Sequence, residues 1–112
     1  MRELLYDAAR HYKNGRTLAE RGDVRGALQA FDQALRDLHA VKPQRMRDVL
    51  LAQVYLSRYQ IARETDGEAA LADLRWGYSY ARTTLEPSVR RLAEELWRRR
   101  WAGAEEEPQA TR

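Results

Sequence analysis

The fold of this chain is decided by residues 15–35, which read GRTLAERGDVRGALQAFDQAL. Apolar residues in this segment recur at spacings of three and four rather than two, which indicates amphipathic helices and not strands. Gly22 is suited to end a first helix, because glycine readily adopts the left-handed conformation that follows many helices. Asp23 is suited to cap the N-terminus of a second helix. The segment therefore predicts two helices joined by a tight turn.

The same helical spacing continues on both sides of this segment. Glycine and proline are sparse, with 6 and 3 copies, and the spacing predicts helices over residues 3–21, 24–41, 44–64, 65–85 and 87–101. Thr65 with Glu68 three residues later is typical of a capping box that would open the fourth helix. The sequence thus predicts an all-α fold of antiparallel helix pairs, arranged as a repeat or as an irregular bundle.

The first helix pair carries a spaced set of small, turn-forming and large apolar residues: Gly15, Leu18, Gly22, Asp23, Ala27, Phe31, Ala34 and Leu35. Their spacing, G-x2-L-x3-GD-x3-A-x3-F-x2-AL, resembles a tetratricopeptide repeat. Physical reasons agree with the resemblance, because small Gly15 and Ala27 allow two helices to approach closely. Phe31 would then fill the space left between them.

The second helix pair resembles the family less closely. Its residues in the positions of Ala27, Phe31 and Ala34 are Ala70, Leu74 and Gly77. Arg58 stands where the first pair has Gly15, and the offset of 43 residues exceeds the 34 of the family. The resemblance covers residues 3–101 and implies two repeats, with residues 87–101 as a C-terminal capping helix of a short α-α superhelix.

Composition indicates one domain and a tail. The 112 residues are 44% hydrophobic and 33% charged, which fits a single core that we expect within residues 1–102. Residues 103–112 contain three glutamates and one arginine and so carry a net charge of −2. Since the whole chain has a net charge of +3, residues 1–102 carry +5. This segment is polar and contains a proline, so we expect a disordered acidic tail.

Cysteine content and hydropathy favour a cytoplasmic protein. The cysteine count is zero, so the chain has no disulfide, thiolate metal site or cysteine nucleophile. The first ten residues, MRELLYDAAR, are charged and helical, unlike a secretory signal. No segment approaches the roughly 18 apolar residues of a membrane span, so no membrane partner is expected.

The resemblance also implies a binding surface, because the first helix of each tetratricopeptide repeat lines a concave groove. Matching the two helix pairs predicts small residues, tyrosines and arginines along this groove: Ala9, Tyr12, Arg16, Ala52, Tyr55, Tyr59 and Arg63. Tyrosine rings and guanidinium groups are suited to hold a peptide. The alternative is that the tyrosines close the core between the repeats, with only their hydroxyl groups reaching solvent.

A second candidate surface is the segment WRRRW, formed by Trp97, Arg98, Arg99, Arg100 and Trp101. Aromatic and basic side chains interleave here as they do in nucleic-acid-binding segments. Trp97 and Trp101 are four residues apart, so the alternative is that both pack on the fourth helix, against Trp76 and Tyr80, while the arginines face solvent. Exposed Trp76 and Trp101 would instead form an apolar patch with an arginine rim, suited to a homodimer contact.

Catalysis has little support in the sequence. His11 and His39 lie on different predicted helices without metal-binding spacing, and no nucleophile or nucleotide-binding motif is present. We therefore expect neither an enzyme nor a cofactor or metal site. The leading hypothesis is an adaptor that binds a peptide or partner helix in the predicted groove, or that associates with itself. The alternative is a nucleic-acid-associated regulator that uses the basic last helix, which the sequence pI of about 9.5 favours.

Overall fold

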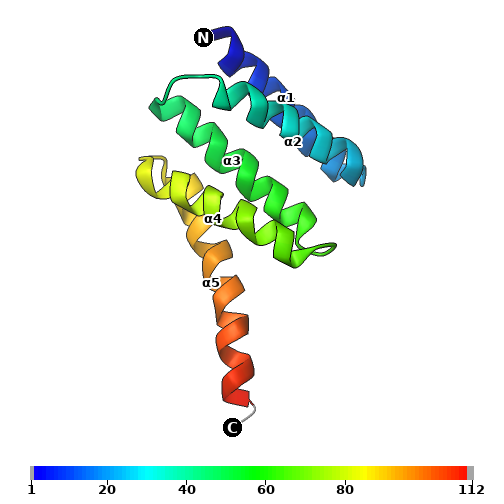
Figure 1. Ribbon diagram of the computed structural model, residues 1–112, viewed down its shortest axis with the longest axis vertical. Coiled ribbons are helices and arrows are strands. Elements are labelled where there is room, and N and C mark those ends of the chain that lie inside the picture. Colours follow the sequence, from blue (N-terminus) through cyan, green and yellow to red (C-terminus); the bar gives the residue numbers. More distant parts are fainter. Residues whose placement is uncertain (1, 111–112) are drawn as a thin grey trace.

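The computed structural model describes the backbone of residues 2–110 and the side chains of residues 3–102 (Figure 1). It contains five helices: α1 (Arg2–Glu20), α2 (Val24–His39), α3 (Arg45–Ala62), α4 (Gly67–Thr83) and α5 (Pro87–Ala110). No strand occurs within residues 2–110. The predicted all-α fold is therefore confirmed.

The helices form two antiparallel pairs and a last helix (Figure 1). The helix α1 packs on α2, and α3 packs on α4, while α3 also contacts both helices of the first pair. The last helix, α5, packs against α4 and α3, and its C-terminal part extends beyond the two pairs. The arrangement is elongated, with principal extents of 55 × 31 × 20 Å.

The turn between α1 and α2 is a Schellman motif centred on Gly22. Gly22 has a φ of 84°, its N–H donates to Ala19, and the N–H of Asp23 donates to Leu18. The carboxylate of Asp23 accepts a hydrogen bond of 2.9 Å from the N–H of Gly26. Both local predictions, the glycine that ends α1 and the aspartate that caps α2, are thus confirmed.

The turn between α3 and α4 repeats this cap 43 residues later. Asp66 is the N-cap of α4, and its carboxylate accepts a hydrogen bond of 3.1 Å from the N–H of Ala69. The predicted capping box that starts at Thr65 is wrong, because the Thr65 hydroxyl donates backward to the carbonyl of Ala62. Asp66 is the residue directly before the first helical residue, so its carboxylate reaches the free N–H groups of α4.

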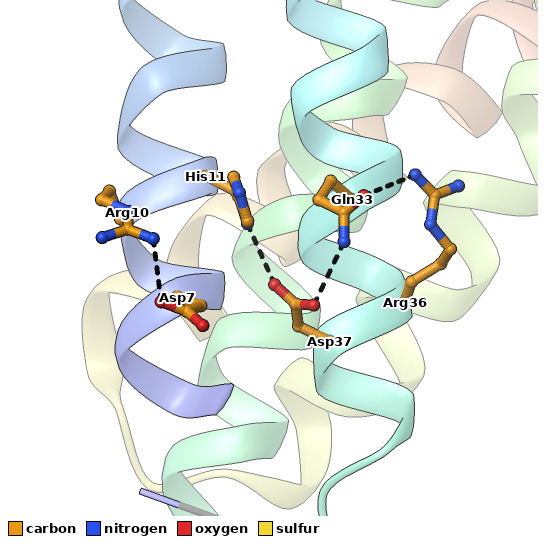
Figure 2. Close-up of polar contacts among 6 residues, drawn as sticks. All are labelled: Asp7, Arg10, His11, Gln33, Arg36 and Asp37. Atoms are coloured by element: carbon orange, nitrogen blue, oxygen red, sulfur yellow. Dashed lines mark hydrogen bonds and ion pairs between the residues drawn. The ribbon is translucent and has the colours of Figure 1, made fainter. Parts of the chain in front are cut away.

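The first helix pair is held together by Phe31, which is 1% exposed. A Cβ atom on Gly15 would lie 2.5 Å from Cε1 of Phe31 and 3.2 Å from the carbonyl oxygen of Ala27. The phenylalanine ring therefore packs directly on the backbone of α1, and only glycine leaves room for it. Polar contacts at the edge of this pair add to the packing (Figure 2).

In those polar contacts, Nδ1 of His11 on α1 lies 2.9 Å from Oδ2 of Asp37 on α2 (Figure 2). The amide of Gln33 donates to the other carboxylate oxygen of Asp37, and Arg36 donates to Gln33. Asp37 is therefore hydrogen-bonded on both oxygens, and His11 joins the two helices.

The second helix pair uses a different close contact. A Cβ atom on Gly77 would lie 2.7 Å from Cδ2 of Leu56, so here the glycine is on α4 and the bulky residue on α3. Arg58 lies 2.8 Å from Asp32 on α2 and 3.3 Å from Asp73 on α4. Burial raises the pKa of Asp73, while Arg58 opposes that shift. Arg58 thus connects α3 to α2 and to α4.

The helix α5 begins at Pro87 and covers the second pair with Val89, Ala93 and Leu96, all buried. Its predicted end near residues 101–103 is too early, because α5 continues to Ala110. Alanine and glutamate, which dominate residues 102–107, are strong helix formers, and one glycine costs only about 1 kcal/mol. The side chains of the predicted acidic tail, residues 103–112, lie outside the described residues, and the domain boundary at residue 102 stays a prediction.

Gly15→Ala is expected to lower the free energy of unfolding by about 1–3 kcal/mol, because the added methyl group meets the Phe31 ring and forces repacking. This loss outweighs the helix propensity that alanine gains over glycine, about 1 kcal/mol. Urea unfolding followed by circular dichroism measures the difference. Gly67→Ala is the matched control, since no atom lies within 4 Å of its added Cβ, and should be at least as stable as the original protein. Equal stability of the two variants would contradict the close contact.

Candidate functional site

The structure does not bring the seven predicted groove residues onto one surface. Ala52 is fully buried and Tyr59 is 5% exposed, and both belong to the core formed with α4 and α5. Their predicted place in an open groove is therefore wrong. The reason is the docking of α5, whose apolar residues Val89 and Ala93 cover this face of α3.

The predicted groove residues of α1 lie along its contact with α3. The hydroxyl of Tyr12 is 3.2 Å from Oγ of Ser57, and its ring centroid is 5.9 Å from that of Phe31. The guanidinium carbon of Arg16 lies 5.8 Å from the Tyr12 ring centroid. Ala9 is half-buried and lines an apolar pocket of about 270 Å³ with Leu5, Tyr6, Met46 and Leu50. Tyr12 therefore closes the space between the helix pairs, as the alternative predicted.

Tyr55 belongs to an aromatic cluster that joins α3 to α4. Its ring is nearly parallel to that of Tyr80, with centroids 6.1 Å apart, and Trp76 stacks on both rings. The Tyr55 hydroxyl is 3.0 Å from Nε2 of His39 at the end of α2. Burial raises the pKa of Tyr55 and lowers the pKa of His39, which nearby Arg47 lowers further. Both groups are thus favoured in their neutral forms.

An open pocket of about 440 Å³ lies where the end of α3, the start of α4 and the middle of α5 meet. We call it the arginine pocket, and its lining residues are Tyr59, Arg63, Glu64, Gly67, Arg99 and Arg100. The guanidinium carbon of Arg63 lies 5.9 Å from the centroid of the Tyr59 ring. Arg99 forms an ion pair with Glu95 one turn earlier on α5. The pocket therefore gathers three guanidinium groups and two nearby carboxylates.

The second predicted surface is divided between two faces of the molecule. Trp97 stacks on Tyr78 of α4 with ring centroids 4.4 Å apart, and Trp101 meets Trp97 edge to face at 5.6 Å. The packing of Trp97 on α4 is confirmed, although its partner is Tyr78 and not Trp76 or Tyr80. Trp76 instead belongs to the aromatic cluster with Tyr55, so the proposed common patch of Trp76 and Trp101 is wrong.

The three consecutive arginines of α5 also diverge. Arg98 is exposed and lines a shallow hollow with Trp97, Trp101 and Ala102. Arg100 places its guanidinium carbon 5.2 Å from the Trp101 ring centroid and also reaches the arginine pocket. Successive helical residues point about 100° apart, so the basic run is divided between two places: Arg98 lines the hollow beside the tryptophans, whereas Arg99 and Arg100 line the arginine pocket.

The sequence patterns do not bring the residues of the arginine pocket together. They predict Arg63 in the groove, and Arg99 and Arg100 on a separate surface. The usable signal was the predicted capping role of residues 87–101, because a capping helix must lie beside the preceding repeat. That role would have placed the basic side chains of α5 next to the end of α3.

The described residues contain neither a metal-binding cluster nor a membrane-spanning helix. Among the described side chains, residues 3–102, no three histidines, aspartates or glutamates lie close enough together to hold a metal ion. Within the described helices, none combines the length and apolar character needed to cross a bilayer.

Comparisons with known proteins give no further assignment. No protein-family model matches the chain, and no curated protein or solved structure shows significant similarity to it. The features of the molecule that bear on function are therefore the arginine pocket and the exposed helix faces.

Tyr59→Ala is expected to lower the free energy of unfolding by about 3–5 kcal/mol, as truncations of large buried aromatic residues do. Loss of the ring leaves a cavity between α3 and α5, and thermal or urea unfolding measures the effect. Tyr6→Ala is the matched control, because Tyr6 is 71% exposed and its loss should change stability by less than about 0.5 kcal/mol. An equally small loss of stability for Tyr59→Ala would contradict the burial of Tyr59 and favour its predicted place in an open groove.

Proposed function

We propose that this protein is an interaction module, similar to tetratricopeptide adaptors of the cytoplasm, that binds an acidic segment of a partner protein. The observation that carries the proposal is the arginine pocket, where Arg63 of the α3–α4 turn meets Arg99 and Arg100 of α5. The residues come from separate parts of the chain and surround one open volume. Such convergence is suited to a ligand with several carboxylates.

Guanidinium groups recognise carboxylates through paired N–H donors, which gives orientation as well as attraction. The guanidinium group of Arg63 packs on the aromatic ring of Tyr59, so its side chain loses less conformational entropy when a ligand binds. Arginine and tyrosine are also the residue types that contribute most to binding energy at protein interfaces. An acidic peptide that lies across the pocket would contact all three arginines.

The helix-pair architecture supports the comparison with tetratricopeptide adaptors. Aspartate caps repeat at Asp23 and Asp66, and each accepts a hydrogen bond from the N–H three residues later. The close contact of Phe31 on Gly15 matches the residue pattern of one repeat of the family. These features favour a short array of helix pairs, an architecture that commonly presents extended binding surfaces.

Nucleic-acid binding is the second candidate function, favoured by the adjacent arginines 98–100. One observation favours a peptide instead. One face of the Trp97 ring is covered by Tyr78, so it is not free to stack on a base.

The combined variant Arg63→Gln, Arg99→Gln, Arg100→Gln tests the proposal with a fluorescein-labelled, glutamate-rich peptide of eight residues. Fluorescence anisotropy should show micromolar binding to the original protein and at least about tenfold weaker binding to the variant. Each exposed ion pair contributes up to about 1 kcal/mol, so losing three is enough for this change. Binding to the corresponding glutamine-rich peptide should be weak for both proteins.

The matched control is Arg21→Gln, Arg25→Gln, Arg36→Gln, which removes the same charge from exposed positions on the first helix pair. It should bind the acidic peptide almost as tightly as the original protein. Equal losses in both variants would show a net-charge effect and overturn the pocket. Steeply salt-dependent binding to single-stranded or duplex DNA, without peptide binding, would favour the second function.

A further inference from the structure

A second surface lies on the outer face of α4. Its members recur at spacings of three and four and form what we call the α4 stripe: Glu68, Leu71, Ala72, Arg75, Trp76 and Ser79. They line a shallow hollow of about 570 Å³ to which no other helix of the described chain contributes. Among the described residues α2 makes no backbone contact with α4, so the first helix pair leaves the stripe uncovered.

Trp76 is the large apolar residue of this stripe. It is 53% exposed, although its ring stacks on Tyr80 at 6.1 Å and on Tyr55 at 6.4 Å. The stacked rings hold the indole in place from behind while leaving much of it in water. A large, fixed and exposed aromatic side chain is the usual anchor of a protein interface.

The charged residues of the α4 stripe are placed to pair with the same residues of a second copy. Glu68 and Arg75 lie seven residues apart on the same face, about 10 Å along the helix axis at 1.5 Å per residue. None of the ion pairs among the described side chains involves either residue. If two copies of α4 lie antiparallel with their centre between Leu71 and Ala72, each Glu68 is opposite the Arg75 of the other copy.

Side-chain size suits the same arrangement. Ala72 lies at the centre, where a small residue allows two helices to approach closely. Trp76 follows four residues later on the same face and would flank the contact, with its ring over the partner's helix. An isologous contact requires one patch to be its own complement, and the α4 stripe meets this requirement in charge and in shape.

We propose that the protein forms a two-fold symmetric homodimer through antiparallel pairing of α4 with α4 of a second copy. One helix face buries less than the roughly 800 Å² per partner of standard stable complexes, so we expect a weak dimer that dissociates on dilution. The inference does not depend on the proposed function, because the α4 stripe and the arginine pocket share no residue.

Sedimentation equilibrium of the full chain between about 5 and 500 μM tests the proposal. The original protein should show a monomer–dimer equilibrium. Glu68→Arg and Arg75→Glu should each raise the dissociation constant at least tenfold, because each places like charges opposite one another twice. The double variant Glu68→Arg, Arg75→Glu should restore dimerisation, because the exchange recreates both ion pairs.

A mixture of the two single variants gives the sharpest result. The Glu68→Arg copy presents only positive charges along the α4 stripe and the Arg75→Glu copy presents only negative charges, so the two should form a heterodimer more readily than either forms a homodimer. The matched controls are Glu20→Arg and Arg21→Glu, exposed charges on the first helix pair, which should leave the dimer unchanged. Circular dichroism verifies that every variant is folded.

Three outcomes would overturn the proposal. One is an original protein that stays monomeric at every concentration. The second is a dimer that neither single charge reversal weakens. The third is a folded double variant that stays as monomeric as the single variants, which would show that Glu68 and Arg75 do not face one another across a two-fold axis.

Discussion

The structure depends on the contact between the Phe31 ring and the backbone at Gly15. This contact sets how closely α1 and α2 approach, and it buries the largest apolar side chain of the first pair. The surface that results is the one on which α3 packs, since Leu51 and Val54 belong to the same core as Phe31. The position of α3 then determines where α4 and α5 can dock, so one close contact orients the later helices.

The helix α3 is the element that connects the two halves, and it is buried on more than one side. One face packs on the first pair through Leu51 and Val54, and another packs on α4 and α5 through Ala52 and Leu56. A helix with apolar residues on most of its circumference is typical of a central position. The arginine pocket forms at the end of this central helix, where α5 passes beside it. The central position of α3 therefore determines both the packing of the core and the place of the arginine pocket.

The two proposed surfaces, the arginine pocket and the α4 stripe, are suited to different kinds of partner. The arginine pocket has three guanidinium groups beside two carboxylates, and this positive excess is suited to a different, acidic partner. The α4 stripe contains both signs and is suited to a second copy of the chain. A dimer through α4 would carry two arginine pockets, so a partner with two acidic segments could bind both copies and gain from multivalency. Binding and self-association would then act together without sharing a residue.

Local sequence determined the helices, the Gly22 turn and the Asp23 cap, because each depends on interactions among residues close in the chain. The sequence also predicted that Phe31 fills the space beside Gly15, because a small and a large residue stand at positions that face one another across the first two helices. Only the tertiary structure decided that Tyr59 is buried and that Arg63 meets the arginines of α5. Periodicity shows that α3 is apolar but not which of its apolar faces receives α5, since that choice depends on packing between helices distant in the sequence.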